Sequence, residues 1–127
     1  MSIEELKTLV GRPYTEFDKA GNYFGCFEPL YFLYPEAPRF KLPENKEDFY
    51  DFALNRIQET LEQIDCNEIS EGDVIVFKHP FNVLHIGIYL GDFKIIQVFK
   101  NSTMTINKID LDNKRIVGVF RERRNYD

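Results

Sequence analysis

Two apolar patterns predict helices in the first third of the chain. The capping sequence Ser2-Ile3-Glu4-Glu5 precedes apolar residues at helical spacing, which predicts a helix over residues 3–10 that ends at Gly11. A second helix begins at Cys26 and carries an almost wholly apolar run as far as Tyr34. Because a helix that is apolar all round has no face for water, we expect this second helix to be buried.

A third helix and five strands are predicted for the rest of the chain. Asn45 is the expected N-cap of an amphipathic helix that ends near Asp65. Its apolar face consists of Phe49, Ala53, Ile57, Leu61 and Ile64. From Gly72 onward the period changes to that of strands. Five short runs rich in Val, Ile, Phe and Thr are predicted to be strands, namely residues 73–78, 84–90, 95–100, 103–109 and 116–121.

The order of these elements predicts the fold class. Helices come first and a meander of strands follows, which is typical of α+β proteins with an antiparallel sheet. A length of 127 residues is expected to form one domain, 1–127. A hydrophobic content of 43% and an aromatic content of 15% are typical of a globular protein and exclude a disordered chain.

Charge and hydropathy narrow the range of partners. A net charge of -5 leaves no basic footprint for nucleic acid, and the only basic cluster, Arg121 to Arg124, is interpreted as solvated surface. No apolar run approaches the roughly 20 residues that a membrane span needs. The first five residues lack the basic and apolar regions of a signal peptide. We therefore expect a soluble product made in the cytoplasm, with neither nucleic acid nor a membrane as its partner.

The few cysteines and histidines do not match a metal site of a familiar kind. Cys26 and Cys66 could form one disulfide, but without a secretory signal two free thiols are expected. Four zinc ligands would require both cysteines, His79 and His85 at spacings unlike those of a finger or ribbon. We expect no metal and no cofactor, and interpret Cys66 as a bystander in a polar turn and His79 as surface or rim.

One combination of residues could supply nucleophilic catalysis. A cysteine nucleophile needs a base that takes its proton and a third polar group that orients the base. Cys26 is expected at the start of the buried helix, where free N–H groups and the helix dipole favour a thiolate. His85 begins an apolar strand, and Gln97 is the lone polar residue within the next one. A polar side chain between β-forming residues needs a partner, and orienting His85 would provide one.

Each of these residues also has a purely structural interpretation. A cysteine on an apolar helix is usually a small buried hydrophobic residue, and a histidine at a strand end is more often structural than catalytic. Gln97 would simply point to solvent if its strand lay at an edge. The hairpin matters here, because directly opposed residues share a face of a sheet. A two-residue loop at Asp92-Phe93 would put His85 and Gln97 on opposite faces, whereas a three-residue loop or a bulge would bring them together.

Four segments resemble the NlpC/P60 cysteine peptidases of cell-wall hydrolysis. They are Gly11-Arg12-Pro13-Tyr14, Gly25-Cys26 with the apolar helix that follows, Glu71-Gly72-Asp73-Val74-Ile75-Val76-Phe77, and His85-Ile86-Gly87-Ile88-Tyr89-Leu90-Gly91-Asp92. The resemblance covers roughly residues 8 to 120, and the last two segments are its specific part. It implies a papain-like fold, in which a nucleophile helix packs on an antiparallel sheet that carries the other two catalytic residues.

The resemblance also implies roles for single residues. Cys26 matches the family nucleophile and His85 its general base. Gln97, twelve positions after His85, stands where relatives carry a third polar residue, commonly His. Tyr14, twelve positions before Cys26, matches a tyrosine whose hydroxyl lies beside the nucleophile and is thought to assist the oxyanion hole.

The sequence departs from the family pattern around the nucleophile and after the His strand. Relatives usually read Asp-Cys-Ser, with Asp and Ser helping to receive the polar end of a peptidoglycan stem peptide. Here Gly25 and Phe27 occupy these substrate-binding and oxyanion positions. In the turn that follows the His strand, Phe93 stands where relatives often have Gly.

The combined interpretation is a cysteine peptidase or amidase that hydrolyses a peptide or amide bond in peptidoglycan through Cys26, His85 and Gln97. Its expected partner is a peptidoglycan stem peptide or another small peptide or amide. The compact length and the ending Ile116-Val117-Gly118-Val119-Phe120-Arg121 most resemble small members from phage tail modules. This implies phage tail proteins as partners and a location on the virion or at the cell wall. Two alternatives stay open, an inactive structural or assembly component of a phage-like tail, and a thioesterase or acyltransferase on the same fold.

Overall fold

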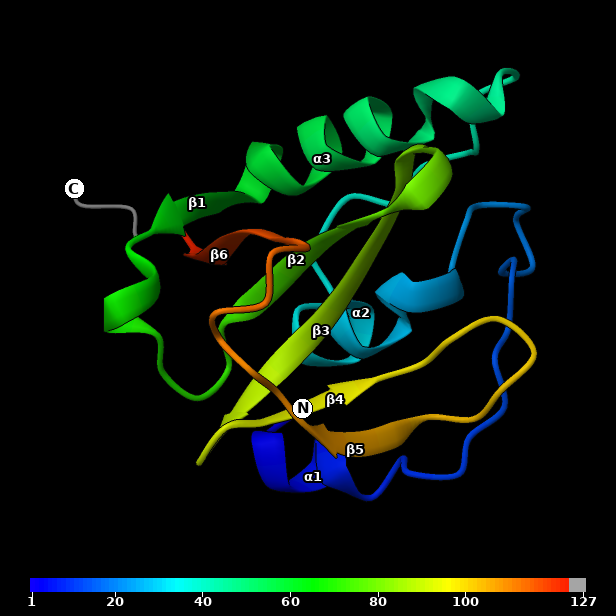
Figure 1. Cartoon of the computed structure of the whole chain (residues 1–127). Helices are drawn as coiled ribbons and strands as arrows, with labels where there is room; N and C mark the ends of the chain where they lie inside the picture. Colours follow the sequence, from blue (N-terminus) through cyan, green and yellow to red (C-terminus); the bar gives the residue numbers. More distant parts are fainter. Residues whose placement is uncertain (124–127) are drawn as a thin grey trace, which may run out of the picture.

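The structure of the protein is a computed structural model, and it describes residues 1–123 (Figure 1). The α-helices are α1 (Ile3–Lys7), α2 (Glu28–Leu33) and α3 (Phe49–Thr60). Four short 3-10 turns are η1 (Gly25–Phe27), η2 (Lys46–Asp48), η3 (Cys66–Glu68) and η4 (Pro80–Asn82). The strands are β1 (Leu61–Ile64), β2 (Val74–His79), β3 (Val83–Gly91), β4 (Lys94–Gln97), β5 (Thr105–Lys108) and β6 (Ile116–Glu122). Within the described residues, no helix has the length and apolar character to cross a membrane.

The first helix has the predicted capping box but ends earlier than expected. The Ser2 hydroxyl accepts a hydrogen bond from the Glu5 N–H (3.1 Å), and the Glu5 carboxylate accepts one from the Ser2 N–H (3.3 Å). The helix stops at Lys7, and the hydroxyl of its C-cap residue Thr8 donates to the carbonyl of Glu5 (2.6 Å). Such side-chain bonds to the backbone compete with helical bonds. The predicted end at Gly11 is therefore wrong.

The cysteine segment also differs from its prediction. Cys26 lies in η1, and α2 begins only at Glu28, so the prediction that Cys26 opens the helix is wrong. Pro29 stands in the first turn of α2, where the missing N–H costs no helical hydrogen bond. Residues 28–31 of α2 are buried, but Phe32 is only half-buried. The helix is thus buried along most of its surface rather than all round.

The third helix is shorter than predicted because its last turn is a strand. Ala53 and Ile57 face the core as the amphipathic pattern requires, and the helix ends at Thr60. Leu61 and Ile64 fit helical spacing but belong to β1, which pairs with β6. The spacing of two apolar residues is compatible with either structure, and backbone pairing with the end of the chain decides between them.

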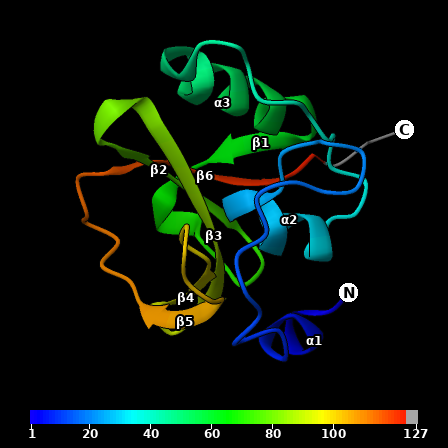
Figure 2. The same ribbon diagram turned by 90° about the vertical axis from the view of Figure 1, so that its right-hand side faces the viewer.

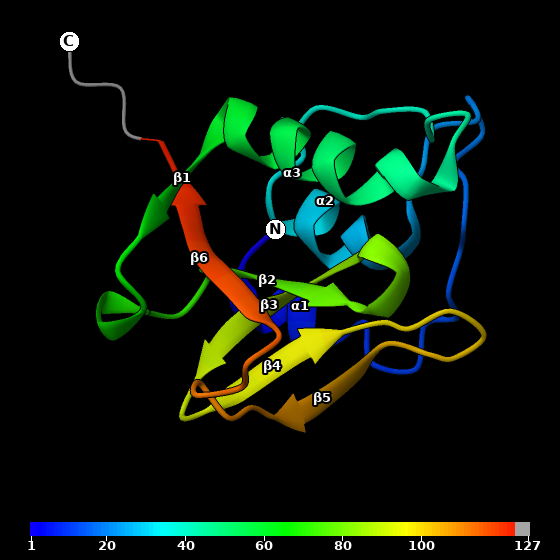
Figure 3. The same cartoon turned by 45° about the horizontal axis from the view of Figure 1, so that its top comes forward.

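The strands form one antiparallel sheet in the order β1-β6-β2-β3-β4-β5. The α+β class is confirmed, and the predicted meander is present from β2 to β5. Two features differ from the prediction. The described residues form six strands instead of five, and β6 returns to lie between β1 and β2 (Figure 3). The first and last strands of the described chain therefore meet side by side.

The two faces of the sheet carry cores of different size. Helices α2 and α3 pack on one face of the sheet (Figure 2). They form the main core with the strand residues Val74, Val76, Leu84, Ile86, Ile88, Ile96 and Phe120. The other face carries a smaller cluster of Ile75, Phe77, Tyr89, Ile95 and Val119. Side chains alternate along a strand, so consecutive residues of β2 and β3 enter different cores.

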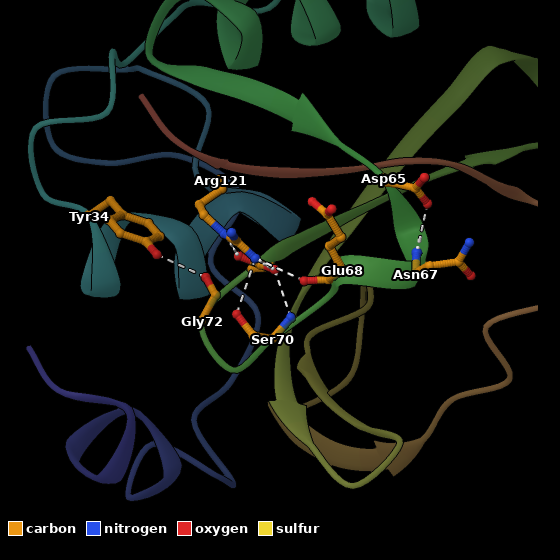
Figure 4. A network of polar contacts seen from close by, with 8 residues as sticks. Tyr34, Asp65, Asn67, Glu68, Ser70, Gly72 and Arg121 are labelled. Carbon is orange, nitrogen blue, oxygen red and sulfur yellow. Dashed lines mark hydrogen bonds and ion pairs between the residues drawn. The ribbon is translucent and has the colours of Figure 1, made fainter. Parts of the chain in front are cut away.

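A polar network fastens β6 to the start of β2 (Figure 4). Arg121 donates from Nε and Nη2 to the two carboxylate oxygens of the buried Asp73, each at 2.8 Å. Its Nη2 also donates to the Glu68 carbonyl and the Ser70 hydroxyl, both at 3.1 Å. The interpretation of this basic cluster as solvated surface is therefore wrong for Arg121, while Arg124 lies outside the described residues.

Candidate active site

A groove of about 450 Å³ brings several of the predicted site residues together. Cys26, His85 and Tyr14 all line it, from the η1 turn, the start of β3 and the N-terminal loop. Much of its remaining wall is apolar, with contributions from Leu42, Pro43, Phe49, Phe81, Val83 and Val98. Glu16, Lys46 and Lys100 are charged lining residues.

A β-bulge puts His85 and Gln97 on the same face of the sheet. The hairpin has a two-residue loop, but Leu90 has no partner, because Tyr89 pairs with Ile95 and the next pair is Gly91 with Lys94. This extra residue shifts the register of β3 by one position. Nε2 of His85 lies 2.9 Å from Oε1 of Gln97. The sequence left the loop geometry open, and the bulge is the alternative that the structure contains.

The neighbours of Gln97 determine which nitrogen of His85 carries the proton. The Gln97 amide nitrogen donates to Oδ1 of Asn107 (3.1 Å), which also accepts from the Thr105 hydroxyl (2.7 Å). Gln97 therefore presents its oxygen to His85, and an oxygen can only accept a hydrogen bond. This arrangement requires a proton on Nε2 and leaves Nδ1 of a neutral His85 as a proton acceptor. Asn107 was not predicted, and an isolated Asn in the edge strand gives no signal of this role.

Aromatic rings surround the imidazole of His85. Phe99 stacks on it with ring centres 4.2 Å apart and planes 8° from parallel, and Phe77 and His79 lie 5.7 and 5.5 Å away. Burial lowers the pKa of His85 to about 4. The hydrogen bond that His85 donates to Gln97 opposes this shift, whereas charge repulsion from His79 adds to it. His85 is therefore neutral at pH 7.

Cys26 is a buried thiol. The residue is 5% exposed, and Sγ lies 3.6 Å from the Leu84 carbonyl and 3.8 Å from the hydroxyl of Tyr23. Burial raises the pKa of Cys26 to about 11, while hydrogen bonds from Tyr23 and from the backbone of Ile86 oppose the shift. This direction is opposite to the one expected from a helix N-terminus, because burial outweighs the dipole of a short turn.

Cys26 and His85 approach the groove from different sides of β3. Cys26 belongs to the main core with Leu84, whereas His85 is paired with Phe77 of the smaller cluster. No hydrogen bond joins Cys26 to His85 among the described residues. The groove thus holds a neutral thiol and a neutral imidazole that line the same space without forming an ion pair.

Two tyrosines accompany the thiol. Burial raises the pKa of Tyr14, and the side chain of Tyr23 partly offsets this. Tyr23 was not predicted; its hydroxyl accepts a hydrogen bond from the Cys26 N–H at 3.4 Å, and burial raises its pKa far above the ordinary value. Tyr23 stands three positions before the cysteine, a proximity that could have served as a signal.

The residues on either side of Cys26 do not line the groove. Phe27 is 1% exposed and packs in the main core, where its ring centre lies 5.2 Å from that of Phe40. Gly25 has a positive φ of 46°, and a Cβ at this position would lie 2.1 Å from the Tyr23 hydroxyl. The space that a side chain at position 25 would need is therefore filled by Tyr23.

A buried carboxylate follows the nucleophile turn and was also not predicted. Glu28 is fully buried and forms an ion pair with Arg12. Its other carboxylate oxygen has no hydrogen-bond partner among residues 1–123. Burial raises the pKa of Glu28, and Arg12 opposes the shift. Arg12 also lies 5.0 Å from the ring centre of Phe32, one turn further along α2. A lone Glu within an apolar run was the available signal. Among residues 1–123, no cluster of three or more His, Cys, Asp or Glu side chains could hold a metal ion.

Comparison with known proteins identifies the family. A sequence model described as the NlpC/P60 family matches residues 11–121, which include every residue of the groove described above. The chain belongs to the NlpC/P60 family. The family expected from the four sequence segments is thus confirmed, whereas no curated protein matches the sequence in a direct comparison.

Solved structures of NlpC/P60 proteins share the fold. The peptidoglycan hydrolase RipB from Mycobacterium tuberculosis is 16% identical over 98% of this chain and 63% of its own, with a TM-score of 0.59. An NlpC/P60 family protein from Bacillus cereus is 20% identical over 94% of this chain and 38% of its own, with a TM-score of 0.61. RipD from M. tuberculosis, described as a non-catalytic NlpC/p60 domain protein adapted to peptidoglycan binding, is 15% identical over 95% of this chain and 92% of its own, with a TM-score of 0.55. The chain spans less than two thirds of the RipB and B. cereus chains.

Proposed function

We propose that this NlpC/P60 protein is a cysteine hydrolase of the peptidase or amidase type, and that its substrate is a peptide or amide bond of peptidoglycan. Cys26 is the nucleophile, His85 the general base and Gln97 the residue that orients His85. The observation that carries the proposal is the hydrogen bond that His85 Nε2 donates to Gln97. Gln97 does not line the groove itself, but it orients His85, which lines the groove together with Cys26. This hydrogen bond leaves Nδ1 free to accept a proton. The description of RipB as a peptidoglycan hydrolase supports the choice of substrate.

The reaction starts from a neutral thiol and a neutral imidazole. Sγ of Cys26 attacks the carbonyl carbon, the thiol proton passes to His85, and the carbonyl electron pair moves to oxygen. The C–N bond then breaks, and the protonated His85 gives its proton to the leaving amine. Water hydrolyses the resulting thioester, which releases the acid and restores the thiol. A protonated His85 cannot start this sequence, so activity falls as the pH is lowered toward about 4.

A second candidate is a protein that binds peptidoglycan without cleaving it. The raised pKa of the Cys26 thiol favours this alternative, because a thiol that resists ionisation is a weaker nucleophile at neutral pH. The description of RipD as a non-catalytic, peptidoglycan-binding protein gives it a precedent within the family. The thioesterase or acyltransferase alternative is favoured by the apolar walls of the groove.

A hydrolysis assay with two cysteine variants tests the proposal. The wild-type chain, Cys26→Ala and Cys66→Ala are incubated with purified sacculi, with soluble stem peptides and with an acyl thioester. We expect the wild type and Cys66→Ala, which changes a half-buried thiol outside the groove, to release new amino groups from the wall substrates. Cys26→Ala should lose at least about 100-fold in rate.

Each of the other outcomes identifies an alternative. Release of amino groups by Cys26→Ala at the wild-type rate contradicts the role of the thiol. Binding of sacculi without release supports the non-catalytic candidate, and cleavage of the thioester alone supports the thioesterase.

A further inference from the structure

Tyr23 contacts both the sulfur and the backbone nitrogen of Cys26. Its hydroxyl oxygen lies 3.8 Å from Sγ, where the hydroxyl proton can be donated to sulfur, and 3.4 Å from the backbone nitrogen, from which it accepts a hydrogen bond. Tyr23 also lines the groove together with Tyr14 and Cys26. The hydroxyl is therefore next to the atoms that take part in an attack by the thiol.

Packing holds this hydroxyl in place. Tyr23 is 8% exposed, and its ring centre lies 6.0, 5.8 and 5.4 Å from those of Phe27, Phe40 and Phe49. On the side of the nucleophile turn, the missing side chain of Gly25 provides the space that the hydroxyl occupies. A residue with a Cβ at position 25 would collide with the Tyr23 hydroxyl, so the sequence of the turn and the position of the tyrosine depend on each other.

This arrangement changes the donors available to an oxyanion. In cysteine hydrolases the backbone N–H of the nucleophile is a natural donor to the negative oxygen that forms during attack. Here the Cys26 N–H already donates to the Tyr23 oxygen, and the Tyr23 hydroxyl carries its own proton at the same place, directed at Sγ. We propose that Tyr23 is a further catalytic residue. Its hydroxyl donates a hydrogen bond to the oxyanion, in addition to the hydrogen bond from the Tyr14 hydroxyl. The proposal rests on the proposed hydrolase function.

The chemistry of a buried tyrosine fits this role. When the C–S bond forms, the carbonyl π electrons become a lone pair on oxygen, and the Tyr23 O–H turns from sulfur to that oxygen without losing its proton. When the C–N bond breaks, the oxygen becomes a carbonyl again and the donor returns to its starting position. Burial keeps the pKa of Tyr23 far above the working range, so the hydroxyl remains a donor throughout. Phenol donors aimed at developing negative charge are most effective in such dry surroundings.

The test compares Tyr23→Phe with a matched control. Tyr31→Phe removes another largely buried hydroxyl of the same aromatic cluster, one that donates to the Pro38 carbonyl at 3.2 Å and does not line the groove. Hydrolysis of the wall substrate that the wild type cleaves best is measured as kcat and KM. Alkylation of Cys26 by iodoacetamide is measured in parallel, because it displaces iodide from carbon and forms no oxyanion.

We expect Tyr23→Phe to lower kcat by about 100-fold with little change in KM, and Tyr31→Phe to stay within about twofold of the wild type. Alkylation of Cys26 should change by less than about fivefold in Tyr23→Phe, because only a weak hydrogen bond to sulfur is lost. The two melting temperatures establish that both variants are folded.

The other outcomes overturn the proposal in distinguishable ways. If Tyr23→Phe hydrolyses the substrate as fast as the wild type, Tyr23 has no catalytic role although the proposed function stands. If hydrolysis and alkylation fall by the same factor, Tyr23 acts only through the thiol or the fold. If the wild type cleaves no substrate, the proposed function fails and the role of Tyr23 fails with it.

Discussion

Burial controls the protonation of both titratable groups in the candidate site. Cys26 and His85 are only 5% and 4% exposed, and burial shifts both pKa values so that the neutral forms are favoured. The shifts have opposite directions because one group is an acid whose charged form is negative and the other a base whose charged form is positive. A single physical cause thus explains why the site rests as a neutral pair.

The neutral state of His85 should make the stability of the fold depend on pH. The folded pKa of about 4 lies below the ordinary value of 6.5, so the unfolded chain binds the proton more readily between these values. Stability is therefore lost as the pH falls from about 6.5 to 4, by up to about 3 kcal/mol. Urea unfolding at pH 7 and pH 4 measures this loss in the wild type and in His85→Gln.

The test compares the loss of stability in the wild type with that in His85→Gln, because carboxylates titrate in both proteins and contribute equally to both losses. His85→Gln should lose about 3 kcal/mol less than the wild type over this range. His79→Gln serves as the control, because His79 is only half-buried whereas His85 is buried. Parallel losses in the wild type and His85→Gln would show that His85 is not buried as a neutral group.

Short irregular segments, rather than the regular helices and strands, place the side chains of the site. The bulge at Leu90 sets the face on which His85 lies relative to Gln97. The 3-10 turn η1 holds Cys26, and it contains a glycine in the left-handed region with no room for a side chain. These elements extend over very few residues, yet each one fixes which groups meet in the groove.

The η1 turn should not tolerate a side chain at Gly25. In Gly25→Ala, the added Cβ lies 2.1 Å from the Tyr23 hydroxyl, and φ is +46°. Overpacking and backbone strain together should destabilise the fold by about 3 kcal/mol. Gly11→Ala is the matched control, because Gly11 also has a positive φ but has no atom within 4 Å of its added Cβ.

Thermal or urea unfolding of the two variants checks this expectation. Gly11→Ala should lower the free energy of unfolding by only about 1 kcal/mol, which is the backbone strain of a side chain at a positive φ. An equal cost in both variants would mean that the close approach of Tyr23 does not constrain position 25.

At the scale of the whole molecule, the end of the described chain completes the middle of the sheet. Strand β6 lies between β1 and β2, so it connects the segment after α3 to the rest of the sheet. Asp73 is 2% exposed at the start of β2 and depends on Arg121 of β6 for its charge partner. Tyr34, next to α2, donates to the carbonyl of Gly72 at 2.8 Å and links the same region to the helical layer (Figure 4).

Removing the Arg121 side chain should destabilise the whole fold. Arg121→Met leaves Asp73 as a buried carboxylate without a cation, which costs about 3 kcal/mol or more. Arg56→Met is the control, because Arg56 pairs with Glu59 on the exposed surface of α3, and the loss of such a pair costs at most about 0.5 kcal/mol. Unfolding in urea measures both variants, and a similar small loss in each would show that Asp73 is not held by Arg121.

The sequence by itself determined the features that depend on neighbouring residues. The capping box at Ser2, the amphipathic face of α3 and the strands from β2 onward follow from short-range spacing, because side-chain direction repeats with the period of the local structure. The α+β class and the NlpC/P60 family followed from the same patterns and from the Asp73 and His85 segments. Cys26, His85, Gln97 and Tyr14 were also selected from sequence, and the first two meet in one groove with Tyr14.

Only the tertiary structure decided the features that depend on distant residues. The strand at Leu61 needed β6 as a partner, and the bulge at Leu90 depends on how β3 pairs with β4. The raised pKa of Cys26 arises from surroundings supplied by several segments, and Tyr23 could be placed beside it only once the chain was folded. Pairing, burial and the exclusion of water are sums over contacts that are remote in sequence, so local spacing does not contain them.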